Sequence, residues 1–141
     1  MLLAKATTYA LKALALMARE PDNTYFPVSK LAKELDISPT YLAKVLQRLV
    51  EPGLLKSTTG PGGGFALAKK SEKISLYDAM LLLEPEDTMK QCVLGWVACS
   101  GTNPCPVHDV WAEYKDKMIK QMSDTDLDRI SKTNWLSNNK K

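Results

Sequence analysis

The sequence is poor in the side chains that most often build catalytic and metal centres. It contains one histidine and three cysteines in 141 residues. All four lie in one window, residues 92–108. The chain has no CxxC pair, no nucleotide-binding glycine fingerprint and no paired-carboxylate pattern. We therefore expect a protein that is not an enzyme.

Long hydrophobic runs are also missing, since no apolar stretch approaches the roughly 20 residues that cross a bilayer. Residues 1–20 resemble a signal peptide, but their apolar residues recur at helical spacing around Lys12 and no small-residue cleavage site follows. An odd number of cysteines does not fit a disulfide framework. The sequence predicts a cytoplasmic protein without a membrane partner, whose cysteines serve metal or redox chemistry.

The charge is unevenly distributed along the chain. The formal net charge is +3, but residues 1–73 carry eleven basic and six acidic residues, whereas residues 74–141 carry eight and ten. The first part is therefore net positive and the second slightly negative, which favours an anionic partner for the first part. A difference of this size is common in proteins, so the residue pattern has to decide.

Helical periodicity predicts a helix over residues 6–19, with Thr7 or Thr8 as its cap. A short helix with Ser29 as its expected N-cap follows, and then the tight turn 36–38. In the next helix Ser38 caps the start, Pro39 occupies the first position and Pro52–Gly53 is the end. Two short helices joined by about three residues form a helix-turn-helix.

The second of these short helices has two distinct faces at about 100° per residue. Its apolar face contains Leu42, Val45, Leu46 and Leu49, and its outer face contains Thr40, Ala43, Lys44, Gln47 and Arg48. The outer face is short, polar and basic, as a surface that reads the major groove of DNA must be. The alternative is that Lys44 and Arg48 only solvate a surface helix.

Residues 54–70 are two strand-like runs around "GPGGG", which has four glycines in five positions. Such a segment predicts a hairpin whose tip approaches another surface closely. A helix-turn-helix followed by a glycine-rich hairpin is a winged helix, with the wing lying along DNA. The predicted DNA-contacting residues are Ser29, Lys30, Thr40, Tyr41, Ala43, Lys44, Gln47, Arg48, Lys56, Thr58, Thr59, Gly60, Pro61, Gly62, Gly63 and Gly64.

The remainder predicts a core helix within residues 74–85, a cysteine loop and a long helix over residues 107–122. An apolar stripe on the long helix requires a partner, and a second copy of the chain is the simplest one. Packing against its own domain is the alternative. The stripe consists of Val107, Trp111, Tyr114, Met118 and Met122.

The fold class is thus mainly α with a small β-wing. We expect a winged helix-turn-helix domain over residues 1–84, a cysteine-rich loop over 85–106, a dimerisation helix over 107–123 and a polar tail over 124–141 that frays after a last short turn.

Three stretches, "TTYALKALALMA", "VSKLAKELDISPTYLAKVLQRLVEPGLLKSTTGPGGGFALAK" and "ISLYDAM", resemble the IscR/NsrR-type family of winged-helix transcriptional regulators. The similarity extends to about residue 122. The resemblance implies a homodimer that binds a palindromic operator in double-stranded DNA. It also implies a cluster loop before the dimerisation helix, which in many members holds an iron–sulfur cluster on three cysteines and one further ligand. Some relatives lack those cysteines.

The cysteines are spaced C-x(6)-C-x(5)-C, and a histidine follows the last of them as C-x(2)-H. Gaps of five and six residues are too long for compact zinc knuckles and suit a loop that wraps a larger inorganic core. Zinc on three sulfurs and one nitrogen remains an alternative, as do metal-free thiol sensing and cysteines that are only small buried side chains.

By the resemblance, Cys92, Cys99 and Cys105 are the cluster cysteines, and His108 matches the histidine ligand of the IscR-like branch. The histidine favours a 2Fe–2S cluster over 4Fe–4S. The first gap is one residue longer than the IscR-like pattern and contains Trp96. Thr8 occupies the position at which the NsrR branch has an acidic ligand, which favours His108 further; Asp109 and Asp87 are spare oxygen donors.

These observations predict a dimeric DNA-binding regulator whose affinity depends on an iron–sulfur cluster and which senses iron–sulfur status, redox state or nitric oxide. The alternatives within the same fold are a zinc-bound or metal-free thiol regulator. More distant alternatives are an interaction module that has lost DNA binding, because Thr59 replaces an arginine that many relatives carry before the wing glycines, and a redox enzyme.

Overall fold

The computed structural model describes residues 3–85, 88–89, 91–94 and 101–134. Within these residues it contains helices packed around one core and a two-stranded antiparallel sheet. No helix in the described part is long and apolar enough to span a membrane. The mainly α fold with a small β-wing is therefore as predicted.

Helix α1 (Lys5–Met17) is the central helix, and its residues Ala10, Ala13 and Leu14 are fully buried. It begins earlier than predicted, because neither Thr7 nor Thr8 caps it. Ala4 is the N-cap residue, and its amide donates to the Glu84 carboxylate at 2.7 Å. The start of α1 is thus fixed by a side chain 80 residues away, which no local capping pattern reveals.

Helix α2 (Val28–Leu35) has Pro27 rather than Ser29 at its N-cap, so the expectation for Ser29 was wrong by two residues. No side chain caps the helix; the Pro27 carbonyl accepts hydrogen bonds from the Lys30 and Leu31 amides at 3.1 and 3.3 Å. The turn to the next helix passes through Asp36, which adopts a left-handed conformation at φ 55°.

Helix α3 (Pro39–Gln47) begins as predicted, with Ser38 accepting a hydrogen bond from the Tyr41 amide at 3.3 Å and Pro39 in the first position. It ends at Gln47 instead of continuing to Pro52. The following residues form successive turns, in which the Leu49 amide bonds to Leu46 and the Gly53 amide to Val50. These turns place Leu49 and Leu54 in the core.

The wing consists of β1 (Leu55–Thr58) and β2 (Gly64–Leu67), paired antiparallel from Leu55↔Leu67 to Thr58↔Gly64. It is anchored to the body by a bridge between Phe26 and Phe65, whose amides and carbonyls exchange hydrogen bonds of 2.8 and 3.0 Å. The segment between α1 and α2 thus acts as a third, very short strand beside β2.

A 3₁₀ turn (Ser71–Lys73), α4 (Leu76–Leu83), α5 (His108–Ser123) and α6 (Leu127–Ser131) complete the fold. The last short turn expected in the tail is α6, which packs on α1 with Leu127 fully buried, and residues 135–141 lie outside the described residues. Backbone hydrogen bonds of 2.9 Å join Leu76 to Thr125 and Leu127 to Ile74. The residues around Leu127 are mostly polar, so the sequence pattern did not indicate that this leucine is an apolar anchor.

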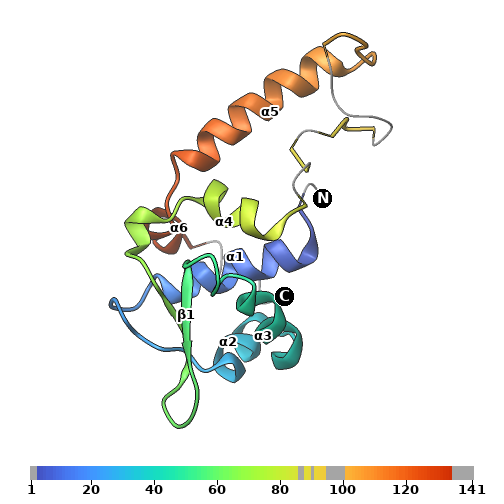
Figure 1. The fold of residues 1–141 in the computed structure, drawn as a ribbon. Coiled ribbons are helices and arrows are strands. Elements are labelled where there is room, and N and C mark those ends of the chain that lie inside the picture. Colours follow the sequence, from blue (N-terminus) through green and yellow to red (C-terminus); the bar gives the residue numbers. More distant parts are fainter. Residues whose placement is uncertain (1–2, 86–87, 90, 95–100, 135–141) are drawn as a thin grey trace.

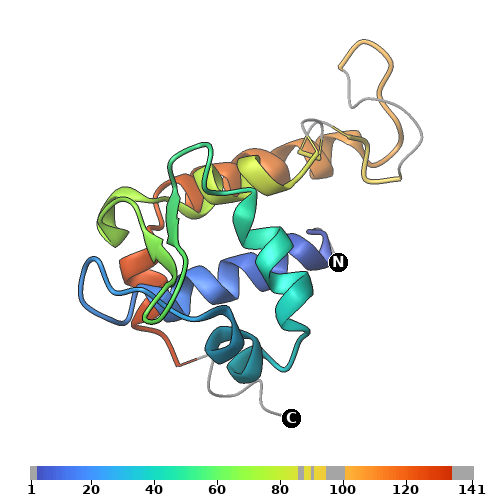
Figure 2. The same ribbon diagram turned by 60° about the horizontal axis from the view of Figure 1, so that its bottom comes forward.

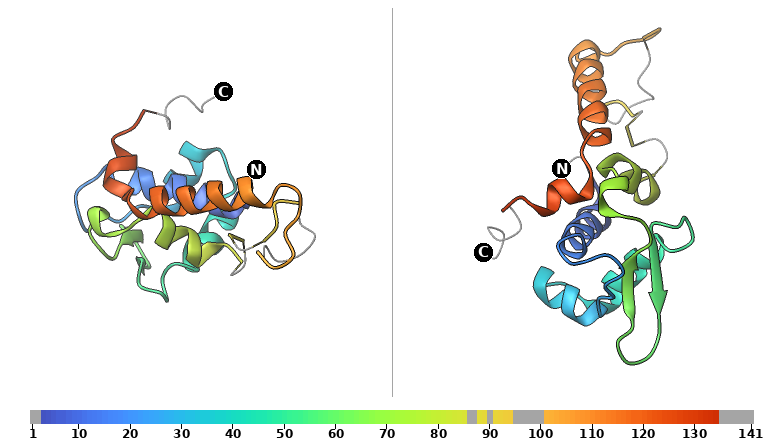
Figure 3. Two further views of the ribbon diagram at one scale, coloured as in Figure 1. Left: turned by 90° about the horizontal axis from the view of Figure 1, so that it is seen from above. Right: turned by 90° about the vertical axis from the view of Figure 1, so that its left-hand side faces the viewer.

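The elements that are predicted to read DNA and the cysteine loop lie at opposite ends of the molecule. Figure 1 shows α2, α3 and the wing tip at one end and α5 at the other, with α1 and α4 between them. The turned views in Figures 2 and 3 agree, and in Figure 2 the N-terminal part of α5 and the segment before it project beyond the body. Helices α1 and α4 therefore lie between the two ends.

Candidate functional site

Helix α3 presents its polar face outward. Leu42, Val45 and Leu46 are buried in the core. Of the residues predicted to face DNA, Thr40, Tyr41, Lys44 and Gln47 are exposed and Ala43 is half-buried. The face is therefore accessible, as a recognition surface has to be. Tyr41 is braced from the side by Tyr9 of α1, whose ring meets it edge-on at 6.2 Å.

Arg48, which the sequence places on the same outer face, has a contact of a different kind. Its guanidinium Nη2 donates to the main-chain oxygen of Leu83, in the last turn of α4, at 2.8 Å. Arg48 is the C-cap residue of α3. Its side chain thus reaches back to α4, and the end of the recognition helix is tied to the end of α4.

The wing carries its predicted contacts on an exposed hairpin. Thr58, Thr59, Gly60 and Pro61 are exposed, and the described backbone at Gly60, Gly62 and Gly64 has positive φ. Gly63 and Gly64 are half-buried, because the turn closes at the former and the latter lies against Phe26. Ser29 and Lys30, in the first turn of α2, are exposed as well.

Lys56 of β1 is held by side chains from the segment before α2. Its ammonium lies 2.7 Å from Oδ1 of Asn23 and 5.7 Å from the centre of the Tyr25 ring. An ammonium has three donors, so two remain for an anion after the bond to Asn23. The segment before α2 therefore positions one of the predicted cationic contacts, which the sequence alone did not indicate.

Two of the predicted metal ligands meet in the structure. Cys92 is buried, Cys105 is half-buried, and their sulfurs lie 3.8 Å apart although thirteen residues separate them. A disulfide requires about 2.05 Å. Two thiolates about 2.3 Å from one tetrahedral metal are separated by about 3.8 Å. The two sulfurs are therefore not joined in a disulfide; their distance is that of a thiol–thiol hydrogen bond and is also compatible with two thiolates on one metal ion.

His108 is adjacent to this pair in the chain. It is the first residue of α5, and its amide donates to the Cys105 carbonyl at 3.0 Å. The positive end of the α5 dipole therefore points toward the described residues between α4 and α5, which we call the cysteine segment, and it favours negative charge there. Asp109 is exposed in the first turn of α5. Cys99, Trp96 and Asp87 lie outside the described residues.

No group of three or more histidine, cysteine or acidic side chains that would hold a metal occurs within the part of the chain that the structure describes. That part contains Cys92, Cys105 and His108 but not Cys99. The donor set nevertheless fits an iron–sulfur centre or zinc, because both favour thiolate sulfur with imidazole nitrogen and the two described sulfurs have the required separation.

The segment that leads into the cysteine pair is docked on the body. Met89 is 5% exposed, and the Gln91 carbonyl accepts a hydrogen bond from the Trp111 indole at 3.0 Å. The Thr88 hydroxyl donates to the Glu84 carboxylate at 3.1 Å. Glu84 is only 9% exposed. Sequence reasoning missed Glu84, although an acidic residue next to Pro85 in an apolar helix was a visible signal.

The predicted stripe on α5 is divided between two environments. Trp111 is buried within its own chain and stacks on Tyr114 at 5.7 Å. Val107 and Tyr114 are 41% and 47% exposed, and neighbouring Val110 is 75% exposed. Met118 and Met122 are half-buried. The N-terminal half of α5 thus presents an apolar surface to solvent, while Trp111 holds the cysteine segment.

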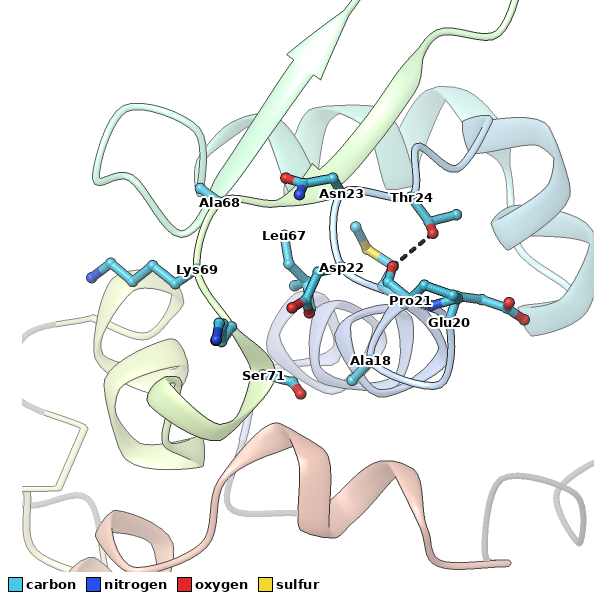
Figure 4. A pocket seen from close by; sticks show the side chains of 12 residues that line it. Ala18, Glu20, Pro21, Asp22, Asn23, Thr24, Leu67, Ala68, Lys69 and Ser71 are labelled. Carbon is cyan, nitrogen blue, oxygen red and sulfur yellow. Dashed lines mark hydrogen bonds between the residues drawn. The ribbon is translucent and has the colours of Figure 1, made fainter.

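Figure 4 shows a pocket between the end of α1, the loop 20–24 and the chain after β2. Charged and amide side chains of Asp22, Asn23 and Lys69 line it, and the Thr24 hydroxyl bonds to the Pro21 carbonyl at 2.7 Å. Its volume of about 160 Å³ is below the roughly 300–1,000 Å³ of typical small-molecule sites. The pocket therefore offers room for water rather than for a small-molecule effector.

A winged helix with this cysteine loop has a counterpart among known families. The family model Rrf2, described as an iron-dependent transcriptional regulator, matches residues 3–133. The chain belongs to the Rrf2 family. A protein of Aquifex aeolicus named as an HTH-type transcriptional regulator is 37% identical over 120 residues, which cover 84% of this chain and 83% of that protein. The regulator IscR of Photorhabdus laumondii is 26% identical over 122 residues, covering 86% and 74%.

Solved structures of Rrf2-type regulators have the same fold. CymR, the global cysteine regulator of B. subtilis, superposes with a TM-score of 0.76 at 20% identity, covering 92% of this chain and 95% of that one. T. potens IscR superposes with a TM-score of 0.71 at 20% identity, covering 91% and 84%. The Rrf2 chain described here is therefore a winged-helix transcriptional regulator and not an enzyme, as the sequence predicted.

Proposed function

We propose that this Rrf2 regulator binds a palindromic operator as a homodimer, and that an iron–sulfur cluster held by Cys92, Cys99, Cys105 and His108 controls its DNA affinity. The observation that carries the proposal is the 3.8 Å separation of the Cys92 and Cys105 sulfurs beside the first turn of α5. When bound, the cluster would supply a redox- and ligand-sensitive centre. A 2Fe–2S cluster suits the single histidine best.

The exposed surface of α5 supports the homodimer. Helix α5 packs on its own chain through α4, whereas Val107, Val110 and Tyr114 are exposed. A second apolar surface lies in a groove of about 400 Å³ between α4 and α5, lined by Tyr77, Leu81 and Ile119 among others. A copy related by two-fold symmetry would cover both surfaces. It would also present two copies of α3 to the two half-sites of a palindrome.

Zinc on the same residues is the second candidate, because the sulfur spacing suits any tetrahedral thiolate-bound metal. Anaerobic purification followed by visible absorption and by iron, sulfide and zinc analysis separates the two. We expect a coloured protein with iron and acid-labile sulfide in equal amounts. A colourless protein with one zinc ion per chain would overturn the cluster in favour of zinc.

His108→Ala tests the fourth ligand. We expect it to change the visible spectrum and to lower the iron content of the purified protein by at least about tenfold, since even outer-shell partners of a metal ligand have effects of that size. The matched control is Asp109→Asn, which changes the neighbouring oxygen donor and is expected to keep the wild-type spectrum. A wild-type spectrum for His108→Ala combined with a changed one for Asp109→Asn would exchange their roles.

Lys44→Ala tests the DNA-binding surface. Lys44 is exposed on the outer face of α3, and an ammonium that neutralises a phosphate releases a condensed counterion. Its removal is expected to weaken operator binding and to reduce the slope of log K against log salt by about 0.9 per monomer. The control is Lys120→Ala, an exposed cation on α5, which lies outside the predicted DNA-contacting surface. Fluorescence anisotropy at several salt concentrations gives both slopes, and equal slopes for the two variants would remove Lys44 from the interface.

A further inference from the structure

Three elements meet at the last turn of α4. The Arg48 guanidinium, at the end of the recognition helix, donates to the Leu83 carbonyl at 2.8 Å. The amide of Ala4, at the start of α1, donates to Oε1 of the next residue, Glu84, at 2.7 Å. The hydroxyl of Thr88, which precedes the cysteine pair, donates to Oε2 of the same carboxylate at 3.1 Å. Two adjacent residues therefore contact α3, α1 and the cysteine segment.

Glu84 is suited to transmit a displacement of the cysteine segment to the start of α1 rather than to absorb it. Its side chain is 9% exposed, so water does not compete freely for its oxygens. Its charge lies against the N-terminal end of α1, where the helix dipole favours it. Hydrogen bonds to an ionised carboxylate are also shorter and stronger than those between neutral groups. The carboxylate and the first turn of α1 are thus expected to move together.

Further described residues between Glu84 and Cys92 are also held on the body. Met89 is buried next to Thr88, Gln91 is fixed by the Trp111 indole at 3.0 Å, and Cys92 follows directly. On the other side, α1 packs against α3. A change in the position of Cys92 therefore has a short route to α1, and from there to the recognition helix.

We propose that Glu84 is the positioning residue that couples the cysteine segment to the DNA-reading helix, through Thr88 on one side and through the start of α1 on the other, with the Arg48–Leu83 contact holding α3 to the same turn. The inference rests on the proposed function, because it explains how the state of the cysteine site alters DNA affinity. It assigns a role to a residue outside both the proposed metal ligands and the predicted DNA-contacting residues.

Thr88→Val tests the link with the smallest change in shape, since it replaces one hydroxyl by a methyl group. The measured quantity is the ratio of operator affinities of the cluster-loaded and cluster-free protein, which for such coupling is typically about 5–150-fold. We expect Thr88→Val to reduce this ratio by roughly three- to tenfold, the effect of one lost hydrogen bond. The visible spectrum of the loaded protein and the affinity of the cluster-free protein should stay as in the wild type.

Two further variants separate coupling from general damage. Thr88→Ser keeps the hydroxyl and should restore the wild-type ratio. Thr133→Val removes a comparable hydroxyl, bonded to the Ile130 carbonyl near the end of the described chain, and should leave the ratio unchanged. Hydrogen exchange gives an independent readout in the full-length protein. The first turn of α1 should differ in protection between loaded and cluster-free wild type, and this difference should shrink in Thr88→Val.

Glu84→Gln keeps the test decisive if Thr88→Val takes up its cluster poorly. It retains the shape of the side chain, removes the charge at the start of α1 and lies farther from Cys92 along the chain. A wild-type affinity ratio in either cluster-bearing variant would overturn the inference while leaving the proposed function intact. Equal affinities of loaded and cluster-free wild type would instead refute the proposed function, and the inference with it.

Discussion

Gly64→Ala is expected to lower the free energy of unfolding by about 3–4 kcal/mol and to abolish operator binding at temperatures where the wild type is folded. A Cβ at this position would overlap the main-chain carbonyl of Phe26. The residue also has φ 140°, where an L side chain is strained by about 1–3 kcal/mol. Relief of the overlap requires separation of Phe26 from Phe65, whose two hydrogen bonds contribute about 1 kcal/mol each.

Gly62→Ala is the matched control for this substitution. Gly62 also has positive φ, at 75°, but nothing lies within 4 Å of the position its Cβ would take. It should therefore lose only about 1–2 kcal/mol, the cost of a left-handed residue with a side chain. Urea denaturation of both variants gives the difference. Equal losses would mean that the contact between Gly64 and Phe26 does not anchor the wing.

These two glycines show which features of the wing the sequence predicts and which it does not. The run of four glycines around Pro61 predicts a hairpin tip correctly, because local conformational freedom is a local property. It does not distinguish a glycine required by a turn from one required by a contact with Phe26, 38 residues earlier. That distinction depends on tertiary packing, which leaves no periodic signal in the chain.

The helix ends also divide into those fixed by neighbouring residues, which the sequence predicts, and those fixed by distant residues, which it does not. Ser38 and Pro39 start α3 as predicted because cap and first turn are contiguous in sequence. The start of α1 was placed too late because Glu84, rather than Thr7 or Thr8, satisfies its first amide. Thr7 instead lies fully buried within α1, and its hydroxyl has no hydrogen-bond partner among the described residues. A long-range cap is invisible to a rule based on neighbouring residues.

For the candidate site, the sequence selected Cys92, Cys99, Cys105 and His108 through their spacing and the family resemblance, and this selection stays a prediction. The structure adds that the Cys92 and Cys105 sulfurs lie 3.8 Å apart. It also adds Arg48 as a contact to α4, Lys56 as a side chain held by Asn23, and Glu84 as the carboxylate between α1 and the cysteine segment. The partners of these three side chains depend on which elements become neighbours, so composition and periodicity could not supply those contacts, although the position of Glu84 in an apolar helix was a visible signal.

The short turn of the tail after α5 has a structural role that the sequence analysis did not assign to it. Leu127 enters the core beside α1, and Arg19, just after the end of α1, donates to the Ser131 and Thr133 carbonyls at 3.0 and 3.1 Å. The Leu76–Thr125 and Leu127–Ile74 backbone bonds fix the same segment to the start of α4. The C-terminal end of α5 is thereby held on the body, while its N-terminal half, near the cysteines, carries the exposed apolar surface.

Leu127→Ala should therefore destabilise the whole chain, by about 2–5 kcal/mol, because Leu127 is fully buried and its removal leaves a cavity between α6, α1 and the start of α4. Arg129→Ala is the control on the same helix, since Arg129 is exposed and its change should stay within about 0.5 kcal/mol. Thermal and urea unfolding measure both. If Leu127→Ala proved as mild as Arg129→Ala, α6 would not be an anchor. If it unfolds at lower urea as expected, α6 anchors the base of α5 to the body, which favours the proposed route through Glu84 and α1 over a tilt of α5 as a whole.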